Sequence, residues 1–346
     1  MSLQQSAGLI SALAQPDMVD LVNRNFVPLQ KMVPLRARQL FINETIGAGV
    51  GAAKLFEEYD VENFALSKPE GTSMKKTKPG LGYQKTAIAK RFGRQVDITW
   101  EMRRYAKEQE VVTAFTNLSH FVPQRMELDL THRFTFADAT SYVNLDGDTV
   151  DLTTADGLAL ASAVHKLAHT STTYRNLVAN NPLLSQGSFE AALDLISNQT
   201  LSNFGEVRNV TPNKLVIHNN PVSRRIAIQL LQSSTDISQV NPNVKNAWQG
   251  DVEVVVLPYL ATTATGKPDS TKRDIWAIGA FNGNVTGWQS YLAIFEEPTL
   301  WTPAKGNNGE NFTTQNWSFG VTGSYDIAVL SGRGIALSLP TSVATY

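Results

Sequence analysis

Two histidines, His165 and His169, are four positions apart, a spacing that would place both imidazoles on one face of a helix as metal ligands. In a zinc peptidase the residue after the first histidine is the catalytic glutamate, but here it is Lys166. The chain has no cysteine, which excludes thiolate zinc sites, iron–sulfur clusters, thiol nucleophiles and disulfide scaffolds. We therefore expect ordinary helix or loop histidines and no bound metal.

Two glycine-containing segments could bind phosphate groups, but neither has the required pattern. Residues 47–52 contain three glycines, yet a dinucleotide fingerprint needs its third glycine one position later, and no β-branched strand precedes them. Residues 71–77 place Lys76 and Thr77 where a phosphate-binding loop needs glycine and lysine. The sequence therefore predicts no nucleotide cofactor.

Carboxylates gather at two places, and neither arrangement is typical of catalysis. Residues 144–151 hold three aspartates in a turn, without the spacing or the terminal glutamate of a calcium loop. Glu57 and Glu58 are adjacent in a predicted strand, so their side chains would point to opposite faces. Because a Gly-x-Ser-x-Gly nucleophile elbow is also missing, we expect no catalytic residues and predict that the protein is not an enzyme.

Two segments have the pattern of strands, residues 53–66 and 82–99. Positive charge gathers on the residues between them and on the second segment. The intervening residues 67–81 are rich in turn formers, which predicts a long two-stranded loop with a mobile tip. Within residues 68–94, eight basic residues stand against Glu70 alone: Lys68, Lys75, Lys76, Lys78, Lys85, Lys90, Arg91 and Arg94. The loop is either solvated or docks on another subunit, and composition alone favours a solvated loop.

The first 45 residues have the pattern of an arm with little core of its own, because three prolines prevent a long helix. Val19, Val22 and Phe26 follow helical spacing, but so short a piece needs a partner surface, which another chain could provide. Residues 101–122 predict a helix, and Pro123 is expected to begin a second one that ends near Asp146.

From residue 151 the pattern alternates between helices and strands, which is typical of a compact α/β domain. Ser188 is expected to cap a helix that ends near Asn203, and Pro221 to begin another. Strands are predicted at residues 214–218, 251–257, 275–281 and 316–339.

The composition restricts the classes of protein further. The 346 residues carry 30 Lys and Arg against 31 Asp and Glu, and a net charge of −1 argues against a dedicated DNA-binding protein. No stretch reaches 18 consecutive apolar residues, and the first positive charge is Arg24, so we expect no membrane span and no signal peptide. A soluble chain made without export is the prediction.

The order of these parts, together with four short motifs, resembles the major capsid protein of tailed bacteriophages. The motifs are Thr154 to Leu160 followed by His165, Pro212 to Ile217, Val252 to Leu260, and Asp274 to Ile278. The first is similar to the segment that opens the axial domain in the Mu-like branch of head subunits. The same fold occurs in encapsulin shells and in the floor of herpesvirus capsids.

This resemblance, which extends over roughly residues 50–340, implies an α+β capsid fold in five parts. They are an N-terminal arm (1–52), an extended loop (53–99), a spine helix with a peripheral domain (100–150), an axial domain (151–315), and C-terminal strands (316–346) that return to the peripheral domain. The helix from Pro123 to Ser141 would be the spine helix.

The implied function is structural. The protein would self-assemble into pentamers and hexamers of an icosahedral viral head that encloses double-stranded DNA, with no cofactor and no membrane. Implied partners are a separate scaffolding protein, a portal and a decoration protein, and implied locations are the virion and, during assembly, the host cytoplasm. Some relatives link a loop lysine covalently to a neighbour's asparagine. An encapsulin-type shell and an α/β enzyme of unknown reaction remain as alternatives.

Candidate interface residues follow from the charge pattern and the arm. They are Lys68, Lys75, Lys76, Lys78, Lys85, Arg91 and Arg94 on the loop, Glu57 and Glu58 on the preceding strand, and Phe26 on the arm. We expect the loop to be received by acidic residues of a neighbour, either on that strand, which also bears Asp60 and Glu62, or on the connector helix with Glu101, Glu108 and Glu110.

Overall fold

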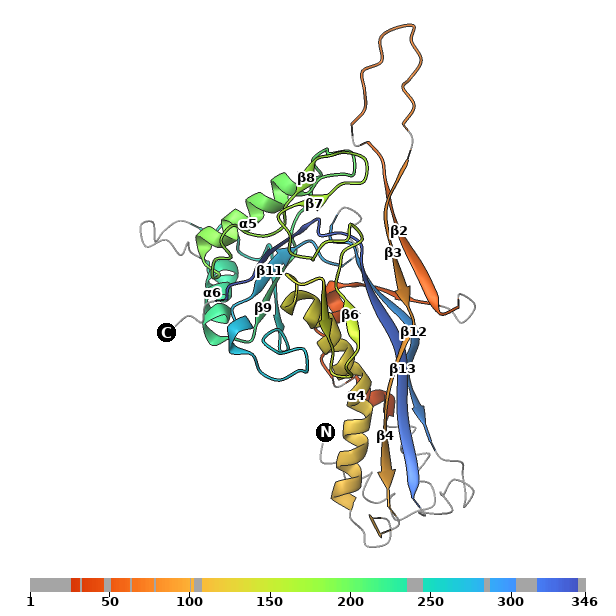
Figure 1. The fold of residues 1–346 in the computed structure, drawn as a ribbon. Coiled ribbons are helices and arrows are strands. Elements are labelled where there is room, and N and C mark those ends of the chain that lie inside the picture. Colours follow the sequence, from red (N-terminus) through yellow and green to blue (C-terminus); the bar gives the residue numbers. More distant parts are fainter. Residues whose placement is uncertain are drawn as a thin grey trace.

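A computed structural model describes residues 26–31, 33–46, 51–62, 64–77, 79–99, 101–102, 108–234, 245–282, 287–302 and 316–341. It shows a body with two sheets, a long helix along one of them, and a hairpin that projects far beyond both (Figure 1). No helix within these residues is both long and apolar enough to cross a membrane.

The first sheet has the strand order β1-β12-β13-β4, with β1 parallel to β12 and the other pairs antiparallel. Its strands are β1 (Ile42–Thr45), β4 (Lys90–Ile98), β12 (Ser290–Trp301) and β13 (Trp317–Val329). The predicted axial-domain boundary is wrong for β12, because hydrogen bonds to β13 place this strand in the first sheet.

Helix α4 (Glu108–Thr135) packs against this sheet, with Phe115 edge-to-face on Phe319 at 4.8 Å between ring centroids. The expectation that a new helix begins at Pro123 is wrong, since α4 runs straight through it. A proline inside a helix costs about 3 kcal/mol or more. A continuous stripe of buried side chains on both sides of Pro123 outweighs that cost: Leu118, Val122, Met126 and Leu130.

The helix ends earlier than the sequence suggests, and a hairpin of β5 (Ser141–Val143) and β6 (Thr149–Asp151) follows it. Asn144 Oδ1 accepts hydrogen bonds from the backbone N–H groups of Asp146 and Asp148, both at 2.9 Å. Gly147 has φ +88°, which favours glycine. The acidic segment is therefore a hairpin turn.

The second sheet has the order β10-β9-β11-β14. Its strands are β9 (Lys214–His218), β10 (Glu253–Leu257), β11 (Trp276–Gly279) and β14 (Ile335–Ser338). Helices α5 (Gln186–Gln199) and α6 (Pro221–Gln232) contact it. Because β14 pairs with β11, the expectation that all C-terminal strands return to the peripheral domain is wrong for this strand.

Helix α5 differs from its prediction at both ends. Its N-cap is Ser185, and Ser188 occupies the third helical position of a capping box in which each side chain bonds the other's backbone. The helix ends at Gln199, ahead of the predicted Asn203, and the cap residue Thr200 is already extended. Pro221 does begin α6, at the first helical turn, as predicted.

The segment before β1 contributes to the main core, contrary to the expectation for an arm. Ala37 and Phe41 have no exposed surface, and Phe41 lies 5.1 Å from Trp288 between ring centroids. Phe26 is 6% exposed and packs in a cluster with Phe115 of α4, so its partner surface belongs to its own chain. Residues 1–25, including Val19 and Val22, lie outside the described residues.

Candidate subunit interface on the projecting hairpin

The projecting hairpin consists of β2 (Ala53–Asp60) and β3 (Gly80–Ile88), which pair antiparallel from Ala53–Ile88 to Asp60–Gly80. Only Ala89 separates β3 from β4, so the hairpin grows directly out of the first sheet (Figure 1). Every described residue of the connecting loop, from Val61 to Pro79, is exposed. The loop therefore adds nothing to the core of its own chain.

The outward face of the hairpin and its loop expose many apolar side chains, beside the polar Glu57, Gln84 and Thr86 on the same face. The alternation of β2 buries Phe56, Glu58 and Asp60 and turns the intervening residues outward. The large exposed apolar side chains of the hairpin and its loop are Leu55, Tyr59, Val61, Phe64, Leu66, Met74, Leu81 and Ile88. Tyr59 and Leu81 are direct cross-strand neighbours. An exposed apolar surface of this kind marks a protein–protein contact.

The opposite face of β2 bears two buried carboxylates that are paired inside the same chain. Glu58 forms an ion pair with Arg333, and Asp60 forms one with Arg208. The backbone N–H of Asn203 also donates to Asp60 Oδ2 at 2.6 Å. The expectation that Glu58 and Asp60 receive a neighbour's lysines is therefore wrong, because both are already occupied.

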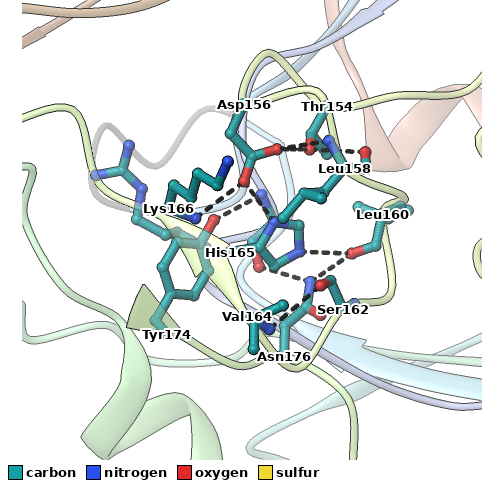
Figure 2. Close-up of polar contacts among 12 residues, drawn as sticks. Thr154, Asp156, Leu158, Leu160, Ser162, Val164, His165, Lys166, Tyr174 and Asn176 are labelled. Carbon is teal, nitrogen blue, oxygen red and sulfur yellow. Dashed lines mark hydrogen bonds and ion pairs between the residues drawn. The ribbon is translucent and has the colours of Figure 1, made fainter. Parts of the chain in front are cut away.

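A polar cluster surrounds His165 (Figure 2). Through Asn176 it also bonds Gly332, which precedes Arg333 in the chain. His165 contacts Asp156 Oδ2 through Nδ1 at 2.8 Å and the Leu160 carbonyl through Nε2 at 3.0 Å. Asn176 donates to the carbonyls of Leu160 and Gly332, at 2.7 and 3.0 Å. Both ring nitrogens of His165 thus face oxygen acceptors, and the histidine has a structural role.

The lowered pKa of Asp156 agrees with a stable contact between Asp156 and His165. Burial raises the pKa of Asp156, but hydrogen bonds from His165 and Thr154 outweigh burial and hold the pKa at about 2.

His165 lies in the short strand β7 (His165–Lys166), which pairs with β8 (Thr173–Tyr174), and not on a helix. His169 instead stacks on Phe204 at 4.9 Å. Among the described residues no group of acidic or histidine side chains could hold a metal ion.

The predicted basic residues separate into two groups. Lys68, Lys75 and Lys76 are exposed on the loop, and Lys78 lies outside the described residues. Those on β3 and β4 have partners within the chain: Lys85 with Asp151 at 2.5 Å, Lys90 with Asp326 at 3.9 Å, Arg91 with Glu296 at 3.7 Å, and Arg94 over the ring of Phe121 at 5.3 Å. Glu57 likewise accepts hydrogen bonds from Tyr59 and Gln84, at 2.5 and 2.9 Å.

A groove of about 800 Å³ lies between α4, β4, the β5–β6 hairpin and residues 259–266. Its walls combine aromatic rings with an ion-pair network in which Arg125 holds Asp129 through two contacts of 3.0 Å and Asp146 through a third. Burial raises the pKa of Asp129. Leu145, at the lining of the groove, is 48% exposed. The groove could therefore accept a chain segment with apolar side chains.

Sequence reasoning missed Arg208 and Arg333, because nothing in their neighbourhood along the chain indicates a partner more than a hundred residues away. A signal was present in β2, where Phe56, Glu58 and Asp60 alternate onto one face. Two carboxylates that share a face with a buried phenylalanine require basic partners.

Comparison with known proteins gives one family match. A family model described as phage capsid protein matches residues 82–338. No curated protein matches the chain. Among solved structures, the capsid of Ralstonia phage GP4 has 11% identity and a TM-score of 0.50, with 89% of each chain covered. The capsid structure of cyanophage P-SCSP1u has 11% identity and a TM-score of 0.49, with 87% of this chain and 86% of that chain covered. At 11% identity the likeness to the Ralstonia phage GP4 capsid concerns the fold alone.

Proposed function

The chain belongs to the phage capsid protein family and is a structural protein of an icosahedral viral shell, and on this premise we propose that the β2–β3 hairpin binds the adjacent copy of the chain. The observation that carries the proposal is the number of large apolar side chains that the hairpin and its loop expose. Tyr59 is 66% exposed and Met74 76%, which is costly for a subunit that remains alone in water. Contact with a second copy removes these side chains from solvent.

The groove beside α4 is the surface that we propose as the receiver. Its aromatic walls suit apolar side chains of the hairpin loop, such as Phe64 and Leu66. Asp148 lines the groove and is exposed, so it provides negative charge for the loop lysines, whereas Asp146 is paired with Arg125. Individual exposed ion pairs contribute only about 0–1 kcal/mol, so the apolar contacts supply most of the affinity.

Repeated around a ring, one hairpin-to-groove contact per subunit closes pentamers and hexamers, because a heterologous contact closes when its rotation fits a point group. We propose further that the shell assembles in the host cytoplasm with a separate scaffolding protein, a portal and a decoration protein, and that it encloses double-stranded DNA. These partners follow from the family resemblance.

Replacement of residues 64–77 by two glycines tests the hairpin, because it removes Phe64 and Leu66 as well as the loop lysines. All of these residues are exposed, so the subunit should keep its fold and its unfolding temperature. Electron microscopy should show closed shells when the parent chain is produced together with the proposed scaffolding protein, and none when the variant is produced in the same way. Shells at the parent yield would contradict the proposal. A matched control is Gly187→Ala in α5, where an added Cβ meets nothing within 4 Å.

A further inference from the structure

The middle of the hairpin is held against the domain of the second sheet by buried charges, beside the stacked rings of His169 and Phe204 that lie against Gly80. Glu58, Asp60 and Arg333 each expose 3% or less of their side chains. Arg333 also donates to the carbonyl of Leu201 at 3.1 Å and to Asn203 Oδ1 at 3.3 Å. One arginine therefore connects the hairpin, the loop after α5 and the turn before β14.

This charge cluster is incompletely satisfied. Glu58 Oε2, Arg333 Nε and Asn203 Nδ2 are buried and have no hydrogen-bond partner among the described residues. Burial of ions costs more than their mutual attraction returns unless the remaining donors and acceptors are also paired. The cluster therefore fixes one orientation of the hairpin while adding little net stability.

Gly80 and Gly82 form a glycine seam, along which β3 lies close to His169 and Asn203. A Cβ added to Gly80 would lie 2.5 Å from His169 Nε2, and a Cβ added to Gly82 would lie 2.6 Å from Asn203 Nδ2. Neither glycine has a positive φ, so their role is close approach and not backbone conformation. A single methyl group at this seam would force either these side chains or the hairpin to move.

The root of the hairpin is attached differently. Phe56 and Ala87 belong to a small apolar cluster with Ala293, Ala328 and Leu330. Phe56 also stacks on Tyr291 at 4.4 Å. The apolar contacts at the root can serve as a hinge, and the ion pairs farther along the hairpin hold it in one position.

We propose that two ion pairs, Arg333 with Glu58 and Arg208 with Asp60, form a releasable lock that sets the direction of the hairpin relative to the second sheet. In the closed position Arg333 binds Glu58 and the glycine seam is in contact. In the released position the hairpin turns about the Phe56–Ala87 root as a unit, with its β2–β3 ladder intact. The lock belongs to the isolated subunit, so it stands or fails independently of shell assembly.

Distances between spin labels test the lock on unassembled full-length subunits. Because the chain has no cysteine, Leu81→Cys and Ala191→Cys label only the hairpin and α5. We expect one narrow distance distribution for the parent chain. Gly82→Ala and Arg333→Met should each add a second distance that holds at least about a tenth of the population, because each removes part of a marginal contact. The double variant Glu58→Met with Arg333→Met should restore one narrow distribution, since no charge is left unpaired at that position.

Controls separate a lock from general loss of structure. Thr86→Ala, on the exposed face of β3, should leave the distribution unchanged. Labels at Ala191→Cys and Ile228→Cys report α5 against α6 and should be unaffected by Gly82→Ala. An unchanged hairpin distance in both Gly82→Ala and Arg333→Met would overturn the proposal. Equal broadening of the α5–α6 distance would also overturn it, because the cluster would then be an ordinary part of the core. If Arg333→Met does not fold, Gly82→Ala decides, since it keeps every charged group.

Discussion

At the scale of single residues, Glu127 of α4 is a buried carboxyl group whose pKa is shifted towards neutral pH. Its Oε1 accepts a hydrogen bond from the backbone N–H of Ala37 at 2.7 Å, and its Oε2 has no partner among the described residues. Burial raises the pKa of Glu127 to about 7, although backbone N–H groups of residues 36–38 lower it in part. The segment before β1 is therefore held on α4 by a carboxyl group that titrates near neutral pH.

This shift predicts a pH-dependent stability. Because the folded protein retains the Glu127 proton up to about pH 7 while the unfolded chain releases it near pH 4.5, the stabilisation is complete below pH 4.5 and is lost as pH rises through 7. The contribution of Glu127 to the free energy of unfolding should fall by about 3 kcal/mol over that interval. Buried His132, whose pKa is lowered to about 3, contributes a change of opposite sign below pH 6.5, so the parent chain is compared with Glu127→Gln. Urea unfolding of both chains at pH 5 and pH 8 isolates the Glu127 part, because Glu127→Gln keeps the acceptor for Ala37 and removes only that titration. The same pH dependence in both chains would contradict the assignment.

Gly332 gives a second prediction at this scale. A Cβ at this position would lie 2.4 Å from Asn176 Nδ2 and 2.7 Å from His165 Nε2, inside the polar cluster. Gly332→Ala should therefore destabilise the subunit by about 1–3 kcal/mol. Gly187→Ala, where the space is open, should be neutral or stabilising by up to about 0.5 kcal/mol. Thermal unfolding of the two variants compares them directly, and equal shifts would show that the cluster is looser than its distances imply.

At the scale of elements, the outer face of the hairpin should matter more than its charges. Tyr59 and Leu81 face each other across the two strands and are 66% and 44% exposed. Changing both to serine should leave the subunit folded and slow shell formation at least about tenfold, because two large apolar contacts are lost in each interface. Light-scattering kinetics record the rate. Ile228→Ser, on the exposed side of α6, is the matched control, and a parent-like rate for the double variant would show that this face is not the interface.

The elements also explain why a proline can lie inside α4. The buried stripe continues from Leu118 to Leu130 across Pro123, and both halves pack on the same sheet. Local propensity would end the helix, but burial of a long stripe stabilises it by more than the proline costs. The single helix in turn fixes the angle between the first sheet and the β5–β6 hairpin, and so forms one wall of the groove.

At the scale of the whole molecule, one core joins both sheets. Trp288 is 1% exposed, and its ring lies 5.1–5.4 Å from those of Phe41, Phe134 and Phe281. The same cluster contains Leu292 of the first sheet as well as residues of all four strands of the second sheet. The two sheets therefore cannot unfold independently without opening this core.

A single unfolding transition is the corresponding prediction. Far-UV circular dichroism and tryptophan fluorescence should report the same midpoint for the isolated subunit. Trp288→Ala should lower the free energy of unfolding by about 3–5 kcal/mol while both probes still coincide. Two separate transitions in the parent chain would contradict the shared core.

The sequence by itself determined much of this protein. The extended character of residues 82–99, the turn-rich loop before them and the absence of cysteine depend on local chemistry, which is visible in neighbouring residues. The division of residues 82–99 at Ala89 into β3 and β4, which belong to different sheets, did not follow from the pattern. The resemblance to tailed-phage capsid subunits rested on the order of these parts, and the family match confirmed it. The exposure of Lys68, Lys75 and Lys76 also followed from a loop without core residues.

Only the tertiary structure decided which charges are free and which are paired. Glu58 and Arg333 are 275 positions apart, so no local pattern connects them, and the same holds for Lys85 with Asp151. Strands β12 and β14 take their places through hydrogen bonds to distant strands, which fix sheet membership. Local propensity sets where an element begins, whereas burial and long-range pairing decide what it contacts, and for this reason the hairpin was predictable but its lock was not.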